Sequence, residues 1–162
     1  MEIEIEPKEV AEYTQRWFDF KDGAKLLIAD ADKPSFNRAL ELNNIQIDRE
    51  LYGIKSITDE SALESRLAFN RAVSHLILGW SGFEDKKTKQ PIEYSQQNAE
   101  LLCTSTKASL ELVLFCLNKS KELRIEKNKT ADEEVGKSLS TIDKETSNGH
   151  QKRQKKSTKS SE

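Results

Sequence analysis

The chain has 162 residues, of which 33% are charged and 35% are hydrophobic, and its formal net charge is -2. No apolar run approaches the roughly 18 residues that a transmembrane helix needs. The first residues lack the pattern of a secretory signal, and two cysteines do not make a disulfide framework. The composition therefore excludes membrane-spanning and disulfide-rich secreted classes and predicts a small soluble interaction domain.

The apolar residues are unevenly distributed along the chain. Residues 1–123 contain 34 of the 38 Leu, Ile, Val and Phe residues and every aromatic residue, whereas residues 124–162 contain ten Lys or Arg and seven Asp or Glu. The second segment has too little apolar surface to offset a backbone-ordering cost of roughly 1–2 kcal/mol per residue. We therefore predict a folded domain over residues 1–123 and a disordered, Lys-rich tail over residues 124–162.

The first predicted element is a β-hairpin. Two segments rich in aromatic, branched and other apolar residues, 13–20 and 25–29, flank Asp22 and Gly23. An Asp-Gly pair between such segments is a strong hairpin signal, because glycine accepts the positive φ that the tight turn requires. The sequence thus predicts two antiparallel strands at the start of the domain.

A helix is predicted to follow from Pro34, a residue that suits the first helical turn. Gly53 interrupts the apolar pattern that begins there. The helical stripe comprises Phe36, Leu40, Asn43 or Asn44, Ile47 and Leu51.

A second helix is predicted to begin near Ser61 and to end near Trp80. Ser61 and Glu64 have the spacing of a capping box, and Gly79 and Gly82 bracket the predicted end. Trp80 has two interpretations, a core residue where the helix meets the next loop or a residue that faces a partner. One helix face comprises Phe69, Val73, Leu76, Ile77 and Trp80.

The last predicted helix covers about residues 97–120, with Ser95 as its N-cap, and it has two opposed apolar faces. One face must pack on the domain, while the other is either buried under the hairpin or free for a partner. The fold class is therefore α+β and mostly helical, with an N-terminal β-hairpin, about three to four helices and a disordered tail. The first face comprises Ala99, Leu102, Cys103, Thr106, Leu110, Val113, Leu114 and Leu117, and the second Leu101, Ala108, Leu112 and Phe115.

Candidate catalytic and calcium-binding motifs fail when their spacing is tested. The segment 79–83 is similar to a nucleophile elbow, but Phe83 stands where that motif needs glycine. Ser35 likewise occupies the position of a calcium loop at which the sharp turn requires glycine. The acidic residues with calcium-loop spacing are Asp30, Asp32 and Glu41.

Histidine and cysteine spacing does not indicate a metal site either. His75 and His150 have no further ligands at zinc spacing. Cys103 and Cys116 lie on one predicted helix and point about 220° apart, so we expect two core thiols that do not bridge each other. The sequence predicts no catalytic residue, no metal site and no cofactor.

The order of the elements resembles that of the tail assembly chaperones of long-tailed bacteriophages, over about residues 13–118. The most specific likeness begins at residues 76–83, where a helix ends in a Trp-x-Gly pattern. A short acidic loop, a proline and an aromatic-Ser helix start follow. One position differs, because the family usually has a glycine directly after its acidic residue, whereas Lys86 follows Asp85 here. The signature positions, to which the resemblance gives structural roles, are Trp80, Gly82, Asp85, Pro91, Tyr94, Ser95 and Asn98.

The resemblance implies a non-enzymatic assembly factor of the host cytoplasm. Such proteins bind the tape-measure protein, a very long and largely helical chain, and keep it soluble until the tail-tube protein polymerises around it. They are absent from the finished particle. The tape-measure protein is therefore the implied partner, with the tail-tube protein as a further candidate.

The two-faced helix suggests how such a partner would bind, since a helical client exposes an apolar seam before it is enclosed. The candidate partner-binding residues are Phe83, Leu101, Leu112 and Phe115, and the alternative is that these residues form core. An exposed stripe would also allow self-association.

Two other functions remain as alternatives. The basic cluster 152–156 could contact nucleic acid, which would indicate a small regulatory protein. The acidic domain and the lack of aromatic residues within the cluster argue against this interpretation. The third function is that of a minor structural protein of the virion.

Overall fold

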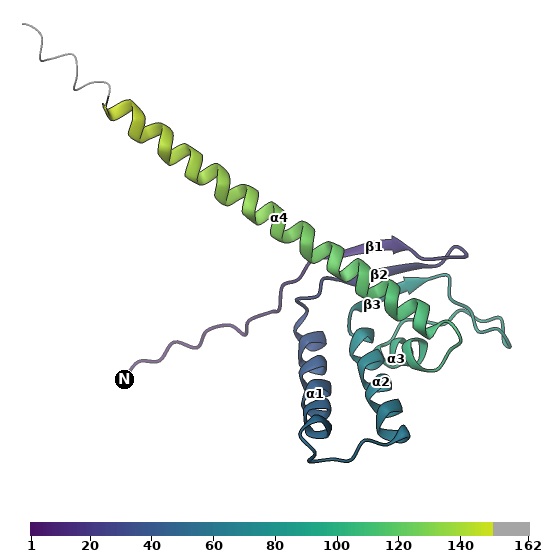
Figure 1. The fold of residues 1–162 in the computed structure, drawn as a ribbon. Coiled ribbons are helices and arrows are strands. Elements are labelled where there is room, and N and C mark those ends of the chain that lie inside the picture. Colours follow the sequence, from purple (N-terminus) through teal and green to yellow (C-terminus); the bar gives the residue numbers. More distant parts are fainter. Residues whose placement is uncertain (151–162) are drawn as a thin grey trace, which may run out of the picture. The chain divides into compact units, whose positions relative to one another are not determined.

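A computed structural model describes the backbone of residues 1–150 and the side chains of residues 1–138. The chain divides into two compact units, Met1–Arg124 and Ile125–Glu162. The fold is α+β and mostly helical, as predicted. Its elements, labelled in Figure 1, are β1 (Gln15–Asp19), β2 (Lys25–Ala29), α1 (Pro34–Leu51), α2 (Asp59–Ser74), β3 (Ile77–Ser81), α3 (Gln96–Thr104) and α4 (Ser109–His150).

Strands β1 and β2 form the predicted hairpin. They pair antiparallel, with Phe18 opposite Leu26. The turn residues Asp22 and Gly23 have φ values of 53° and 79°, and two positive φ values match the hairpin turn that twisted strands favour. The Asp-Gly prediction is therefore confirmed.

The third strand is the main difference from the predicted fold. The sequence predicted a helix that continues to Trp80, but α2 ends at Ser74 and the chain enters β3. This strand pairs antiparallel with β2, which gives the strand order β1-β2-β3. A short apolar run fits a strand as well as a helix, and Gly79 within it disfavours a helix. The free edge of β2 supplies the hydrogen-bond partners that favour the strand.

Helices α1 and α2 form an antiparallel pair, as Figure 1 shows. Pro34 occupies the first turn of α1, as predicted. The N-cap of α2 is Thr58, whose hydroxyl accepts a hydrogen bond from the Ser61 N–H at 3.1 Å, while the Ser61 hydroxyl accepts one from the Thr58 N–H at 3.0 Å. The predicted capping box that begins at Ser61 is therefore wrong, because Ser61 is the third helical residue.

The helix predicted over about residues 97–120 is in fact two helices. Ser95 caps α3 as predicted, and its hydroxyl accepts the N–H three residues on at 3.0 Å. Between α3 and α4, the Ser109 hydroxyl donates to the Leu102 carbonyl at 2.8 Å and accepts from the Thr106 N–H at 2.9 Å. These bonds satisfy polar groups at the break. Because the residues lie on two helices, the predicted pair of opposed faces on one helix is wrong.

One hydrophobic core joins the sheet to the helices. Its side chains come from β2, the chain around β3 and all four helices. The buried members are Leu26, Ile28, Ala31, Phe36, Val73, Leu76, Ile77, Ala99, Cys103, Leu112, Val113 and Cys116.

The two cysteines are fully buried free thiols. They lie on α3 and α4, so the angle predicted for a single helix does not apply. Burial raises the pKa of the Cys103 thiol to about 12, and it raises the pKa of Cys116 well above its ordinary value. Both thiols are therefore protonated across the physiological pH range.

The second unit contains the remainder of α4. Residues 125–150 are helical, whereas the sequence predicted disorder from residue 124. Every described side chain from residue 125 to 138 is exposed, so the segment is helical without burial, and its Lys, Glu and Ala residues favour that conformation. The basic cluster 152–156 and the side chain of His150 lie outside the described residues. No helix in the described part of the chain is both long and apolar enough to cross a membrane.

Candidate functional site

The four predicted partner-binding residues do not share one surface. Leu112 is 2% exposed and belongs to the core. Phe115 and Phe83 are half-buried and both contact Phe20, with ring centroids 5.0 Å and 6.3 Å from the Phe20 centroid. Leu101 is exposed on α3. For Leu112 the structure favours the core alternative, because a buried side chain offers no surface to a partner.

The signature residues predicted to be structural lie in β3, in the loop that follows it and at the start of α3. Trp80 Nε1 donates to the Ile92 carbonyl at 2.6 Å, and the Tyr94 hydroxyl donates to the Ile77 carbonyl at 2.9 Å. The Trp80 and Tyr94 rings meet edge to face with centroids 5.1 Å apart. Trp80 also packs against the core, which favours its interpretation as a core residue.

Two polar signature residues close this loop. The Asp85 carboxylate accepts hydrogen bonds from the backbone N–H groups of Thr88 and Lys87, both at 2.8 Å, and these bonds lower the pKa of Asp85. The Asn98 side-chain amide donates to the Glu93 carbonyl at 2.8 Å. The loop therefore satisfies its own polar groups.

The remaining signature positions fix how the loop joins the sheet. Gly82 has a φ of 82°, and a Cβ at this position would lie only 3.0 Å from the Ala24 Cα. Glycine is thus required there by both conformation and space. Glu84 and Pro91 pair across the loop in an isolated β-bridge.

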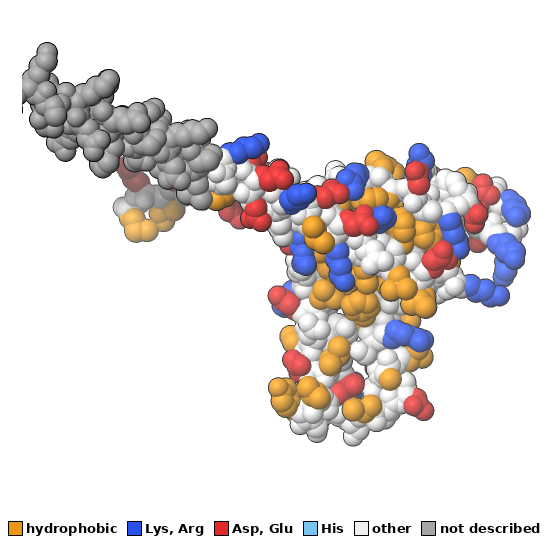
Figure 2. All heavy atoms as spheres, turned by 45° about the horizontal axis from the view of Figure 1, so that its top comes forward, with side chains coloured by type: hydrophobic (Ala, Val, Ile, Leu, Met, Phe, Trp, Pro, Cys, Tyr) orange, Lys and Arg blue, Asp and Glu red, His pale blue; other side chains and the backbone are white. Residues whose placement is uncertain are grey.

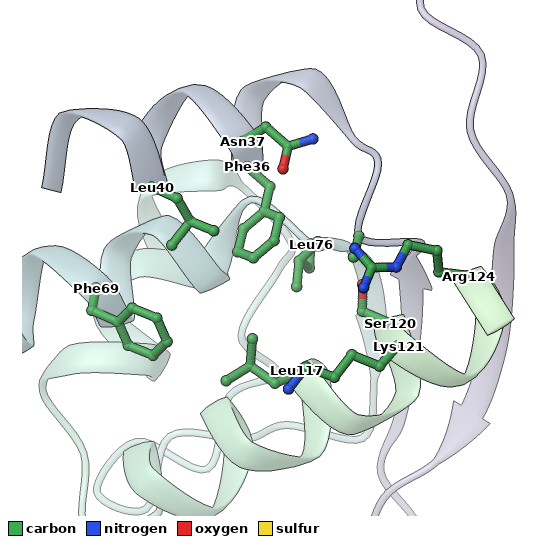
Figure 3. Close-up of a pocket in the computed structure, with 10 residues that line it drawn as sticks. Phe36, Asn37, Leu40, Phe69, Leu76, Leu117, Ser120, Lys121 and Arg124 are labelled. Carbon is green, nitrogen blue, oxygen red and sulfur yellow. The ribbon is translucent and has the colours of Figure 1, made fainter. Parts of the chain in front are cut away.

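An apolar groove lies beside α1, α2 and residues 117–124 of α4 (Figure 3). Its volume is about 270 Å³. Phe36 and Leu40 extend from α1 into this space, and Leu117 extends into it from α4. Phe69 and Leu76 complete the apolar lining. Phe36 and Leu76 are buried, whereas the other three are half-buried. The groove is therefore open to a partner side chain.

The apolar wall of the groove continues along α1 towards the far end of the helix. Phe36, Leu40, Ile47 and Leu51 lie on one helix face by their spacing. Their exposed fraction rises from 5% at Phe36 to 41% at Ile47 and 73% at Leu51. The stripe predicted from the sequence thus begins as core and ends as surface, over a length of about 22 Å.

The tip of the α1–α2 pair adds more exposed apolar side chains, which Figure 2 shows over the far end of the two helices. Several exposed apolar side chains at one end of a small domain favour an interaction site there. The residues concerned are Tyr52, Ile54, Ile57 and Leu63, with exposed fractions of 76%, 75%, 73% and 47%.

The groove also has a polar side. Lys121 and Arg124 line it from α4, and both are exposed. Neither forms an ion pair with any side chain in the described part of the chain. A carboxylate on a bound partner would therefore meet two available positive charges.

Ser120, which lines the same groove, is 1% exposed, and its hydroxyl has no hydrogen-bond partner among the described residues. A buried unpaired hydroxyl costs stability, and alanine has the higher helix propensity. We expect Ser120→Ala to raise the free energy of unfolding by about 1 kcal/mol. Urea unfolding monitored by circular dichroism measures this change. A loss of stability would instead indicate that the hydroxyl is bonded in solution.

Sequence reasoning identified the α1 stripe but missed the groove. The prediction placed Leu110, Leu114 and Leu117 on one packing face, but Leu117 lines the groove while Leu110 and Leu114 are 67% and 51% exposed. The sequence holds no local signal for the groove, because its lining comes from separate helices, and the polar Asn43 in the middle of the stripe is not among the lining residues. Asn43 is 6% exposed, and its Oδ1 has no partner among the described residues.

The described side chains include no group of three or more His, Cys, Asp or Glu residues placed to hold a metal ion. The Asp30 carboxylate, considered above for calcium, instead accepts hydrogen bonds from the Thr14 N–H and the Asp32 N–H, both at 2.7 Å. It therefore has a structural role at the start of β1 and before α1.

A protein-family model described as "YdaY prophage protein" matches residues 31–137. These residues include α1, α2, β3, α3 and much of α4, and therefore every residue that lines the groove. No curated protein and no solved structure matches the chain.

Proposed function

The chain belongs to the YdaY prophage protein family, and from this premise we propose that it is a phage tail assembly chaperone. Its client in this proposal is the tape-measure protein, which it keeps soluble while the tail-tube protein polymerises. It acts in the host cytoplasm, performs no chemical step and leaves before the particle is complete. The observation that carries the proposal is the apolar groove that continues into the exposed stripe of α1.

The dimensions of this surface suit a helical client. The stripe from Phe36 to Leu51 spans about 22 Å, the length of about 15 helical residues. A client helix could place one apolar side chain in the groove and others along Ile47 and Leu51, as in helix-in-groove recognition. Because the stripe is narrow and partly polar, the contact stays modest in area, which suits a chaperone that must release its client.

Exposed residues of the stripe allow a test that leaves the fold intact. We expect the double variant Ile47→Ser, Leu51→Ser to lose the ability to keep the co-expressed tape-measure protein of the same prophage in the soluble fraction. Loss of two apolar contacts should weaken client affinity at least roughly tenfold. The measurement is the soluble fraction of the client, with affinity measured by calorimetry on a client fragment.

The matched control is Leu110→Ser, Leu114→Ser, which removes two exposed leucines of α4 that lie outside the groove lining. This control should solubilise the client as well as the unmodified protein does. Equal loss in both variants would show that general surface apolarity, and not the stripe, is responsible. Full activity of the stripe variant would refute the proposal. Unfolding midpoints of both variants verify that the fold is retained.

A further inference from the structure

The N-terminal arm, residues 1–12, has an unusual pattern that the fold does not use. It contains five glutamates and one lysine. Glu2, Glu4 and Glu6 alternate with Ile3 and Ile5, so an extended arm presents apolar side chains on one side and carboxylates on the other. Every residue of the arm is exposed, with Ile3 at 72% and Ile5 at 92%. Exposed isoleucines in such a regular pattern indicate a segment that binds elsewhere.

The groove has the complementary chemistry. Its interior is apolar, while Lys121 and Arg124 line it without an ion pair to any described side chain. An arm that places an isoleucine in the groove would bring its flanking carboxylates towards these two cations. Apolar burial would supply most of the affinity, and the charges would select an acidic segment.

The arm also starts beside the groove. Thr14 is joined to Asp30 by two hydrogen bonds, from the Thr14 N–H to Asp30 Oδ2 at 2.7 Å and from the Asp30 N–H to the Thr14 carbonyl at 2.8 Å. The next residue, Ala31, lines the groove. In a two-fold pair that brings the two grooves together, each arm therefore starts at the common interface. Twelve extended residues span about 40 Å, which is more than enough to cross it.

We propose that two copies of this protein exchange N-terminal arms, so that residues 2–6 of each copy bind the groove of the other. The occupant is a second copy because the arm is fully exposed on its own domain and leaves its own groove open. Arm exchange forms a closed, symmetric pair in which both grooves are covered. It would protect the apolar groove in the absence of a client, and a client helix would compete with the arm.

Two full-length charge variants test this exchange. The arm variant is Glu2→Lys, Glu4→Lys, Glu6→Lys, and the groove variant is Lys121→Glu, Arg124→Glu. The unmodified protein should form a dimer in analytical ultracentrifugation, and each variant alone should dimerise at least tenfold more weakly. Mixing the two variants should restore a heterodimer, because each arm then meets a groove of opposite charge. Circular dichroism verifies that both variants are folded.

The charge-matched control for the groove variant is Lys107→Glu, Lys129→Glu, which changes the net charge by the same amount at exposed positions outside the groove lining. This control should dimerise like the unmodified protein. An unmodified protein that stays monomeric at its highest soluble concentration overturns the proposal. Arm or groove variants that dimerise as strongly as the unmodified protein would also overturn it. A mixture of the two variants that forms no heterodimer would do the same. The assay contains no client, so its failure leaves the proposed chaperone function untouched, and loss of client binding leaves the dimer result untouched.

Discussion

Replacing Leu112 with serine should lower the free energy of unfolding by about 4 kcal/mol. Leu112 is 2% exposed within the core. Its removal leaves a cavity, and truncation of a buried leucine costs about 2–5 kcal/mol. The serine hydroxyl adds the cost of a buried polar group without a partner. Chemical unfolding measured by circular dichroism gives the difference directly.

Leu114→Ser on the same helix is the matched control. Leu114 is 51% exposed, so its replacement should lower the free energy of unfolding by less than about 1 kcal/mol, mainly through helix propensity. The contrast between the two variants distinguishes a core position from a partner-binding surface for the apolar residues of α4. If Leu112→Ser were as stable as Leu114→Ser, the packing of α4 against the core described above would be wrong.

Replacing Asp30 with alanine should lower the free energy of unfolding by about 3 kcal/mol. The Asp30 side chain is fully buried, and it accepts backbone hydrogen bonds from Thr14 and Asp32. Hydrogen bonds to a charged group contribute about 1.5–3 kcal/mol each, while removal of the charge recovers part of its desolvation cost. The expected loss of unfolding free energy is therefore smaller than the summed contribution of two such hydrogen bonds. Thermal and urea unfolding both measure it.

Asp30→Asn provides an internal comparison for this carboxylate. Asparagine keeps one carbonyl oxygen and can accept only part of the present hydrogen bonding. Asp30→Asn should therefore lower the free energy of unfolding by roughly half as much as Asp30→Ala does. An asparagine variant as unstable as the alanine variant would mean that the negative charge, and not the acceptor geometry, supports the turn before α1.

Local signals in the sequence were sufficient for the elements whose ends are determined by nearby residues. Asp22 and Gly23 specify the hairpin turn because few residues tolerate positive φ. Pro34 and Ser95 mark helix starts because their preference for a first turn or an N-cap depends only on the adjacent backbone. These predictions needed no knowledge of tertiary contacts, and the structure confirms them.

The errors occurred where tertiary contacts decide the outcome. The apolar residues around Gly79 fit either periodicity, and pairing with β2 made them a strand. The break between α3 and α4 could not be inferred from the apolar pattern. The helical spacing of apolar residues continues through residues 105–108, whereas the helical conformation does not. The groove was missed for a related reason. Periodicity shows which side chains share a face of α1, but only the packed structure shows that this face becomes exposed beyond Asn43.

The two buried thiols make the protein its own reporter of internal motion. Cys103 and Cys116 lie on separate helices at 0% exposure and with strongly raised pKa values. A thiol-labelling reagent can therefore react only during moments when α3 or α4 separates from the core. Labelling kinetics on the unmodified chain would count those openings residue by residue, and they would do so without any engineered probe.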